Sequence, residues 1–152
     1  MKKIGLFPGS FDPFTKGHEA VVLKSLQIFD EIIIGVGINS TKQYMFSTEK
    51  RIEHIKTLFE DKPNIRVAQF QCLTVDFCKK IGANNIIRGL RDSKDFQYEK
   101  SIAHMNFDIS GIDTVFFLTE QKYSAINSSI IREIHKNGGP IDSFVTKPEI
   151  LV

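Results

Sequence analysis

The sequence predicts an α/β fold, in which a parallel five-stranded sheet carries helices on both faces. Short apolar runs alternate five times with amphipathic stretches of helix length, which is the pattern of strand–helix–strand units in a parallel sheet. Two of the runs, residues 32–34 and 115–118, are continuously apolar, as expected for strands that are buried on both faces. The length of 152 residues suits one domain. We therefore expect a Rossmann-like single domain over residues 1–152.

The apolar segments and the stretches between them place the elements in order. Strands are expected at residues 4–8, 31–37, 65–70, 85–88 and 114–118. Helices are expected at residues 18–29, 48–59, 74–81, 95–109 and 128–136, with a short last turn opened by Pro148. Ser47 is the expected N-cap of the second helix, and Gly82 is the expected stop of the third.

The composition excludes several classes of protein. Hydrophobic residues make up 41% of the chain and charged residues 25%, as in soluble globular proteins. The net charge of +2 is too small for a nucleic-acid protein that is recognised by bulk charge. No apolar run approaches the roughly 20 residues of a membrane span, and two cysteines fit a reducing compartment. We expect a cytoplasmic protein with no nucleic-acid or membrane partner.

Groups suited to phosphate follow the first predicted strand. Ligands of open parallel sheets bind beyond the carboxyl ends of the strands. Ser10 offers a hydroxyl there, and His18 follows Gly17 at the start of a helix, where anions bind. A histidine in this place can equally cap the helix or pack in the core, so both interpretations stay open.

The second, third and fifth predicted strands end in similar groups. Lys42 suits a phosphate, although a single lysine there is more often a solvated surface residue. Thr74 is expected to cap the third helix, and Leu73 either lines a pocket or belongs to the core. Ser128 and Ser129 are natural caps of the last helix, and their hydroxyls and amides would also cradle a phosphate chain.

Two arginines follow the fourth predicted strand. Arg88 and Arg91 flank Gly89, and arginine recognises phosphate through two parallel hydrogen bonds. A structural alternative would pair them with Asp92 or Asp95, and we favour the phosphate role. The chain lacks dinucleotide-binding, Walker A, zinc and hydrolase-serine motifs. The strand ends together predict a polyphosphate site in a parallel α/β domain.

Motifs along nearly the whole chain resemble those of a known family. They are Gly9-Ser10-Phe11-Asp12-Pro13, Thr15-Lys16-Gly17-His18, Lys42 with Met45-Phe46, Ile87-Arg88-Gly89-Leu90-Arg91, Asp95-Phe96-Gln97-Tyr98-Glu99 and Ala103-His104-Met105-Asn106. The motif ending in His18 resembles the signature of the cytidylyltransferase-like nucleotidyltransferases, and the others narrow the resemblance to the bacterial phosphopantetheine adenylyltransferase family. Ser10 stands where that family usually has threonine. Asn127 replaces the first residue of its usual serine run, for which we expect a retuned ATP affinity.

The resemblance implies an enzyme of coenzyme A biosynthesis. It would reversibly transfer the AMP moiety of ATP to 4′-phosphopantetheine, giving dephospho-CoA and pyrophosphate, with Mg²⁺ as cofactor and a homohexamer as the assembly. The acceptor phosphate is already ionised near neutral pH, so positioning and charge stabilisation suffice and no general base is needed.

The resemblance also assigns residues to roles. The implied catalytic residues are His18, Ser10, Lys42 and Arg91. The implied phosphopantetheine-binding residues are Ser10, Lys42, Leu73, Thr74 and Arg88. The implied ATP-binding residues are Ser10, Phe11, His18, Gly89, Leu90, Arg91, Glu99, Tyr123, Ser124, Ala125, Ile126, Asn127, Ser128 and Ser129. The resemblance assigns no protein ligand to the metal.

Three other functions are weighed against this one. The same scaffold could use a different phosphorylated acceptor, such as nicotinamide mononucleotide or glycerol phosphate. A non-catalytic nucleotide sensor is disfavoured because His18, Lys42 and Arg91 occur together. A flavodoxin-like electron carrier is disfavoured because the chain has no tryptophan, is not acidic and has no hydroxyl-rich loop directly after the first strand.

Overall fold

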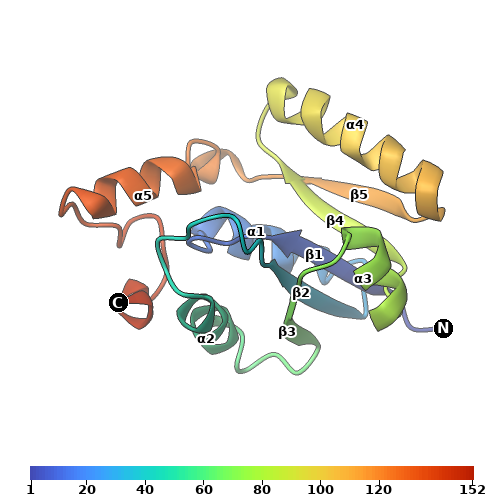
Figure 1. Ribbon diagram of the computed structural model, residues 1–152, viewed down its shortest axis with the longest axis horizontal. Coiled ribbons are helices and arrows are strands. Elements are labelled where there is room, and N and C mark those ends of the chain that lie inside the picture. The colour runs from blue at the N-terminus through green and yellow to red at the C-terminus, as the bar shows by residue number, and fades with distance from the viewer.

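The computed structural model describes residues 1–152 and contains one five-stranded parallel sheet in the order β3-β2-β1-β4-β5 (Figure 1). The strands are β1 (Ile4–Gly9), β2 (Glu31–Gly37), β3 (Ile65–Phe70), β4 (Asn85–Leu90) and β5 (Asp113–Leu118). The helices are α1 (Lys16–Ser25), α2 (Thr48–Leu58), α3 (Thr74–Ile81), α4 (Ser93–Ser110) and α5 (Ser128–Lys136), with short 3-10 helices η1 (Gln121–Tyr123) and η2 (Pro148–Leu151). The predicted fold class is confirmed, including the last turn that Pro148 opens.

The first helix differs most from its prediction. It begins at Lys16 rather than His18 because Thr15 is its N-cap, and it ends at Ser25 rather than Phe29. Beyond Ser25 the backbone tightens, and the amide of Ile28 donates to the carbonyl of Ser25 at 3.0 Å. Such i→i+3 bonds commonly close the last turn of a helix, so the apolar residues that follow belong to a turn.

Local sequence signals predict three helix ends correctly or nearly so. The hydroxyl of Ser47 accepts a hydrogen bond from the amide of Lys50 and caps α2. Gly82 ends α3 with a φ of 73°, in the left-handed region that glycine adopts without a steric penalty. The start of α4 lies two residues before the predicted position because the Asp92 carboxylate accepts from the amide of Asp95.

Two predicted caps are wrong. Leu73, not Thr74, occupies the N-cap position of α3, and no side chain caps that helix. Thr74 is therefore the first helical residue, and its side chain is available to a neighbouring cavity. Asn127 caps α5 in place of Ser128 or Ser129, because its side chain accepts from two amides in the first turn. Asparagine is at least as good a cap as serine.

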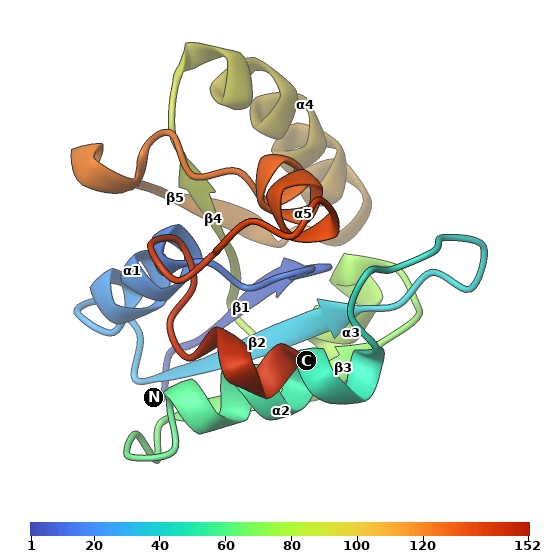
Figure 2. The same ribbon diagram turned by 90° about the vertical axis from the view of Figure 1, so that its left-hand side faces the viewer.

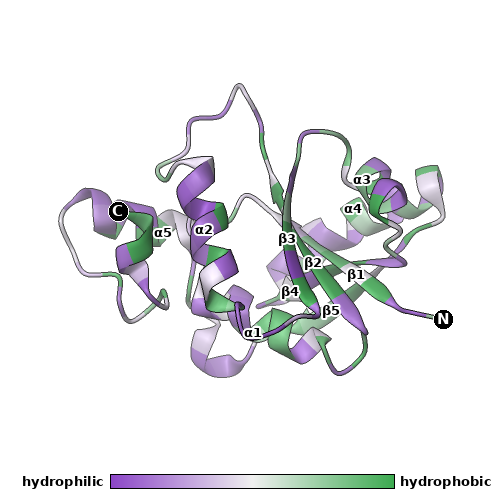
Figure 3. Cartoon of the chain, turned by 90° about the horizontal axis from the view of Figure 1, so that it is seen from below, coloured by the Kyte–Doolittle hydropathy of each residue, from purple (hydrophilic) through white to green (hydrophobic).

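Two apolar clusters cover opposite faces of the sheet. Phe7 belongs to the cluster under α1 and α2, whereas its neighbour Leu6 belongs to the cluster under α3, as the alternation of side chains along a strand requires. Phe96 of α4 contacts Phe116, while Phe117 faces the first cluster, so α4 lies on the α3 face. Figure 2 shows the helices on both sides, and Figure 3 shows hydrophobic residues gathered along the strands.

A third, smaller cluster ties the C-terminal segment to the rest. Ile131 of α5 packs with Phe46, Ile141, Val145 and Leu151. This packing holds α5 and η2 beside the segment before α2, at one end of the molecule in Figure 1. The N-terminus of α5 is thereby placed near the carboxyl ends of the strands. No helix is long and apolar enough to span a bilayer.

The sheet order creates a topological switch point beside the first strand. β1 pairs in parallel with β2 on one side and with β4 on the other. The connections from the two halves of the sheet run to opposite sides there, and this crevice is where open α/β sheets bind ligands.

Candidate active site

Two cavities meet at the carboxyl ends of β1 and β4. They measure about 420 Å³ and about 340 Å³, and both are lined by Pro8, Gly9, Ser10, Arg88 and Glu99. The larger one, the β2-side cavity, extends over Lys42, Tyr44, Phe70 and Thr74. The smaller one, the α5-side cavity, extends over His18, Arg91, Asn127 and Ser128. Both cavities lie where the sequence predicts the site, beyond the strand ends at the switch point. That they bind the substrates stays a prediction.

The β2-side cavity brings Lys42 to the end of β1. Its Nζ lies 3.5 Å from Ser10 Oγ and 5.4 Å from the centroid of the Tyr44 ring. The Tyr44 hydroxyl accepts a hydrogen bond from the amide of Asn39 at 2.9 Å and so closes the loop after β2. Lys42 is therefore held beside Ser10, across 32 residues of sequence.

Leu73 does not line either cavity. Its side chain is 62% exposed. It therefore lies neither in a pocket wall nor in the core, the two places predicted for it. Leu90 is the buried last residue of β4, and Ser124 and Ala125 are exposed. None of these three residues belongs to the lining of either cavity. Phe11, Gly89, Tyr123 and Ile126 do line the α5-side cavity.

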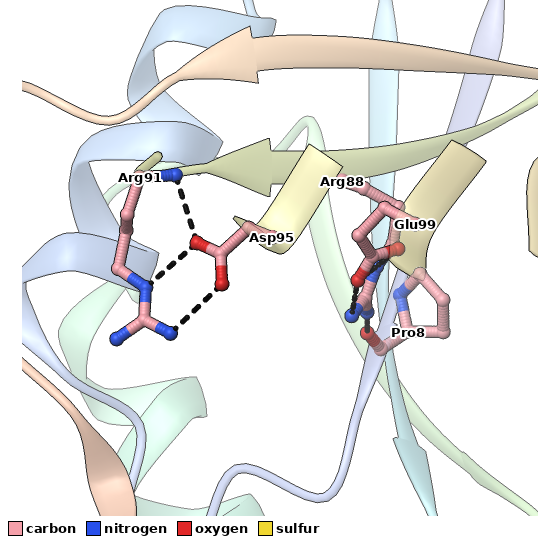
Figure 4. Close-up of polar contacts among 5 residues, drawn as sticks. All are labelled: Pro8, Arg88, Arg91, Asp95 and Glu99. Atoms are coloured by element: carbon pink, nitrogen blue, oxygen red, sulfur yellow. Dashed lines mark hydrogen bonds and ion pairs between the residues drawn. The ribbon is translucent and has the colours of Figure 1, made fainter. Parts of the chain in front are cut away.

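Arg88 and Glu99 form an ion pair (Figure 4) in the wall between the cavities, with Glu99 buried and Arg88 partly exposed. Arg88 Nε lies 3.0 and 3.1 Å from the two carboxylate oxygens, and Nη2 lies 2.6 Å from Oε1. Its Nη1 donates to the carbonyl of Pro8 at 2.6 Å. Glu99 is only 8% exposed. The sequence assigned these residues to different substrates, whereas the structure joins them, with Glu99 orienting the guanidinium.

Arg91 makes the structural pairing with Asp95 that was considered for it, and its phosphate role stays a prediction. It pairs with Asp95 at 3.0 Å (Figure 4). Its Nη1 donates to the carbonyl of Ile126 at 3.2 Å. Burial opposes ionisation of Asp95, but the hydrogen bonds and charge of Arg91 outweigh it and lower the pKa of that carboxyl. The pair fixes the guanidinium at the edge of the α5-side cavity.

His18 is both a capping residue and a wall of the α5-side cavity. Its Nδ1 accepts from the amide of Thr15 at 3.0 Å, while the Thr15 hydroxyl accepts from the amide of His18 at 3.2 Å. This reciprocal arrangement is a capping box. Because Nδ1 is an acceptor, the proton of the neutral ring sits on Nε2. Burial, with the charges of Arg88 and Arg91, lowers the pKa of His18 to about 3. The ring is therefore a neutral donor.

The start of α5 presents a set of polar groups to the same cavity. Asn127 Oδ1 accepts from the amides of Ser129 at 2.8 Å and Ile130 at 3.3 Å. Ser128 Oγ donates to the carbonyl of Pro13 at 3.0 Å. The Ser129 hydroxyl accepts from Arg132 Nη2 at 3.1 Å. Arg132 itself lines the cavity, although no role was predicted for it from the sequence. The only sequence signal for it was its place one turn into the predicted last helix, near the expected phosphate groups.

The carboxylates of the site are all engaged by other groups. Asp12 accepts from the amides of Met45 and Phe46, at 2.9 Å each, and Asp95 and Glu99 pair with arginines. No group of three or more histidine, cysteine or acidic residues could hold a metal ion. Mg²⁺ prefers carboxylates, phosphates and water. The donor set therefore does not form a protein cage for Mg²⁺.

Comparison with known proteins agrees with this geometry. The profile of the cytidylyltransferase-like family matches residues 6–134. A phosphopantetheine adenylyltransferase of Flavobacterium psychrophilum is 50% identical over 144 residues, which cover 95% of this chain and 94% of the relative. One of Lachnoclostridium phytofermentans is 48% identical over 151 residues, which cover 99% of this chain and 93% of the relative.

Solved structures share the fold at low sequence identity. A putative nicotinate-nucleotide adenylyltransferase from Vibrio parahaemolyticus aligns with a TM-score of 0.67 and 21% identity, covering 99% of this chain and 96% of that one. A bifunctional NMN adenylyltransferase/ADP ribose pyrophosphatase from Francisella tularensis, complexed with AMP and a manganese ion, aligns with a TM-score of 0.70 and 20% identity, covering 98% of this chain and 46% of that one.

Proposed function

Because the chain belongs to the phosphopantetheine adenylyltransferase family, we propose how its two cavities perform the family reaction. That reaction, in coenzyme A biosynthesis, transfers the AMP moiety of ATP reversibly to 4′-phosphopantetheine and yields dephospho-CoA and pyrophosphate. The β2-side cavity takes the acceptor and the α5-side cavity takes ATP. The observation that carries this assignment is their common wall at Ser10 and Arg88, where two phosphates can meet.

The acceptor phosphate lies against Ser10, Lys42 and Arg88. Lys42 and Arg88 supply positive charge, and charge-assisted hydrogen bonds to phosphate are the strong ones. The pantetheine arm extends along the β2-side cavity toward Thr74, which lines it. The role assigned to Leu73 stays a prediction, and its main-chain groups are the atoms that would carry it.

The transfer forms one bond to the α-phosphorus of ATP and breaks another. An oxygen of the acceptor phosphate attacks, the bond from the α-phosphorus to the bridging oxygen breaks, and pyrophosphate leaves with the electron pair. His18 Nε2–H donates to the α-phosphate as negative charge builds on it, and Ser10 donates from the other side. Preorganised donors of this kind are the main source of stabilisation in phosphoryl transfer.

Most of the remaining ATP contacts come from the end of β4 and from the segment after β5, with Phe11 after β1 and Glu99 in α4. Arg91, Ser128 and Ser129 lie nearest the β- and γ-phosphates in this proposal. Other ATP contacts are Phe11, Gly89, Leu90, Glu99, Tyr123, Ser124, Ala125, Ile126 and Asn127. Leu90, Ser124 and Ala125 would act through main-chain groups, because their side chains lie outside the cavity lining. We further propose that Mg²⁺ arrives bound to ATP, held by phosphate oxygens and water.

We also propose a homohexamer. Its support is family membership together with large apolar side chains exposed on α4, among them Tyr98 at 70%, Met105 at 69% and Ile109 at 62%. Contiguous exposed apolar surface commonly marks an interface. Light scattering should give six times the 17.3 kDa monomer mass; a monomer mass at working concentration would contradict this.

A single domain over residues 1–152 and a cytoplasmic location stay proposals that follow from the same family membership.

A double dissociation by calorimetry tests the assignment of the cavities. Lys42→Ala should weaken binding of 4′-phosphopantetheine by roughly 1.5–3 kcal/mol, the value of a charge-assisted hydrogen bond, and leave ATP binding unchanged. Arg91→Ala should weaken ATP binding and leave the acceptor unaffected. The opposite pattern, or equal losses for both substrates in both variants, would refute the assignment.

A further inference from the structure

Arg51, in the first turn of α2, is a fully buried residue that lines neither cavity. Its Nε donates to the carbonyl of Phe46 at 3.0 Å, and its Nη2 donates to the Thr48 hydroxyl at 3.0 Å. Its Nη1 donates to the carbonyl of Ser10 at 2.6 Å. Arginine is almost never fully buried unless it is paired, and no carboxylate forms an ion pair with it here. Two carbonyls and a hydroxyl accept its hydrogen bonds instead.

The turn that Arg51 reaches has an unfavourable backbone conformation. Phe11, directly after Ser10, has a φ of 51°, a left-handed value that bulky residues rarely adopt. Such a residue persists only where its surroundings fix it, and these places cluster at functional sites. Arg51 fixes the carbonyl before Phe11, and Arg132 fixes the carbonyl of Asp12 after it, at 2.8 Å. The turn is therefore held from both sides.

The same arginine reaches the loop that carries Lys42. Its guanidinium carbon lies 4.1 Å from the centroid of the Tyr44 ring, and Lys42 Nζ lies 5.4 Å from that centroid. Asp12 joins the loop to the turn a second time, through the amides of Met45 and Phe46. A change in the position of the Arg51 guanidinium would thus displace both the turn and the loop.

We propose that Arg51 is a positioning residue for adenylyl transfer, which fixes Ser10 and Lys42 relative to each other from outside the cavities. Its planar fork suits the task, because it serves three acceptors and still stacks on an aromatic ring, which a lysine cannot do. The inference rests on the proposed roles of Ser10 and Lys42 at the reacting phosphates. It states how those two side chains keep their geometry.

A purely structural role for Arg51 makes a different prediction, and His54 provides the matched control. His54 is also fully buried on α2, one turn further along. Its Nε2 lies 2.7 Å from the carbonyl of Thr146, away from both cavities. His54→Ala should therefore lower the stability of the same helix without moving Ser10 or Lys42.

The test measures melting temperature, kcat and both KM values for Arg51→Met, Arg51→Lys and His54→Ala. A misplacement of about 1 Å can lower a rate 10²-fold, so Arg51→Met should lose about 100-fold in kcat. Its KM for 4′-phosphopantetheine should rise several-fold while its KM for ATP changes less than about twofold. Arg51→Lys should lose at least tenfold in kcat. His54→Ala should melt earlier and keep kcat within about twofold, assayed well below its melting temperature.

Two outcomes overturn the proposal. One is Arg51 variants whose kcat and acceptor KM stay within about twofold of the wild type. The other is a loss of activity in His54→Ala that matches the Arg51 variants at an equal drop in melting temperature. If Arg51→Met does not fold, Arg51→Lys alone decides. Ser10→Ala and Lys42→Ala run in parallel: their full activity would refute the proposed function, whereas their loss with active Arg51 variants refutes only this inference.

Discussion

Replacing His18 with glutamine separates the two contributions of this residue. Glutamine is the usual partner of a capping threonine at the third position of a helix. Its side-chain oxygen can accept from the amide of Thr15 as Nδ1 of His18 does at 3.0 Å. His18→Gln therefore keeps the cap of α1 and removes the fixed Nε2–H donor. His18→Ala removes both that donor and the bond from the amide of Thr15, whereas the Thr15 hydroxyl can still accept from the amide of residue 18.

The magnitudes follow from these two contacts. Loss of one intramolecular hydrogen bond typically lowers stability by about 1 kcal/mol, so His18→Ala should be less stable than wild type by that amount and His18→Gln should not. Loss of one preorganised donor to a developing charge lowers kcat by roughly 10²–10³, and both variants should show this. Because the contact strengthens in the transition state, ATP binding should change little.

Urea denaturation and steady-state kinetics on the same preparations measure both effects. His18→Gln should unfold at the wild-type urea concentration and turn over roughly 10²–10³ more slowly. The catalytic role would be refuted if His18→Ala is destabilised while His18→Ala and His18→Gln both keep kcat near the wild-type value. That result would leave His18 as a capping residue only.

Three other perturbations have outcomes that the contacts determine. The free energy of unfolding should fall as the pH drops below 6.5, the ordinary pKa of histidine. In the folded state the pKa of His18 is lowered to about 3, so only the unfolded chain takes up the proton in this range. The loss from His18 should be about 1 kcal/mol between pH 7 and 5.5, and His54, whose pKa burial also lowers, adds to it; unchanged urea midpoints over this range would contradict the burial argument. Asn127→Ser should be nearly silent in stability and turnover, because serine also caps helices well; a loss of kcat above about tenfold would show a specific role for the amide. Glu99→Gln should lower stability by roughly 1.5–3 kcal/mol, since it weakens charge-assisted bonds to Arg88, and a chemical denaturation curve that superimposes on the wild type would show the pair to be dispensable.

The strand ends are where reasoning from the sequence succeeds best. Buried parallel strands have continuous apolar runs, and the groups that follow them converge because parallel strands end at one edge. This logic alone places Ser10, Lys42, His18 and Arg88 around adjoining cavities. The structure adds that one of them, Lys42, lies 3.5 Å from another, Ser10.

Reasoning from the sequence fails for contacts between segments that only the tertiary structure brings together. A charged residue such as Arg51 is expected at the surface of a helix, yet it is fully buried, and one of its partners is the carbonyl of Ser10 in a distant segment. The pairing of Arg88 with Glu99 depends on how α4 packs over β4. At the start of α5, three adjacent residues can all cap, and only the backbone conformation selects Asn127.

Pyrophosphate release from ATP against a panel of phosphorylated acceptors tests the proposed function most directly. We expect steady release with 4′-phosphopantetheine and none above background with nicotinamide mononucleotide or glycerol phosphate. Mass spectrometry of the same reaction should show dephospho-CoA. Turnover with nicotinamide mononucleotide but not with 4′-phosphopantetheine would contradict the assignment of the β2-side cavity and the function drawn from it.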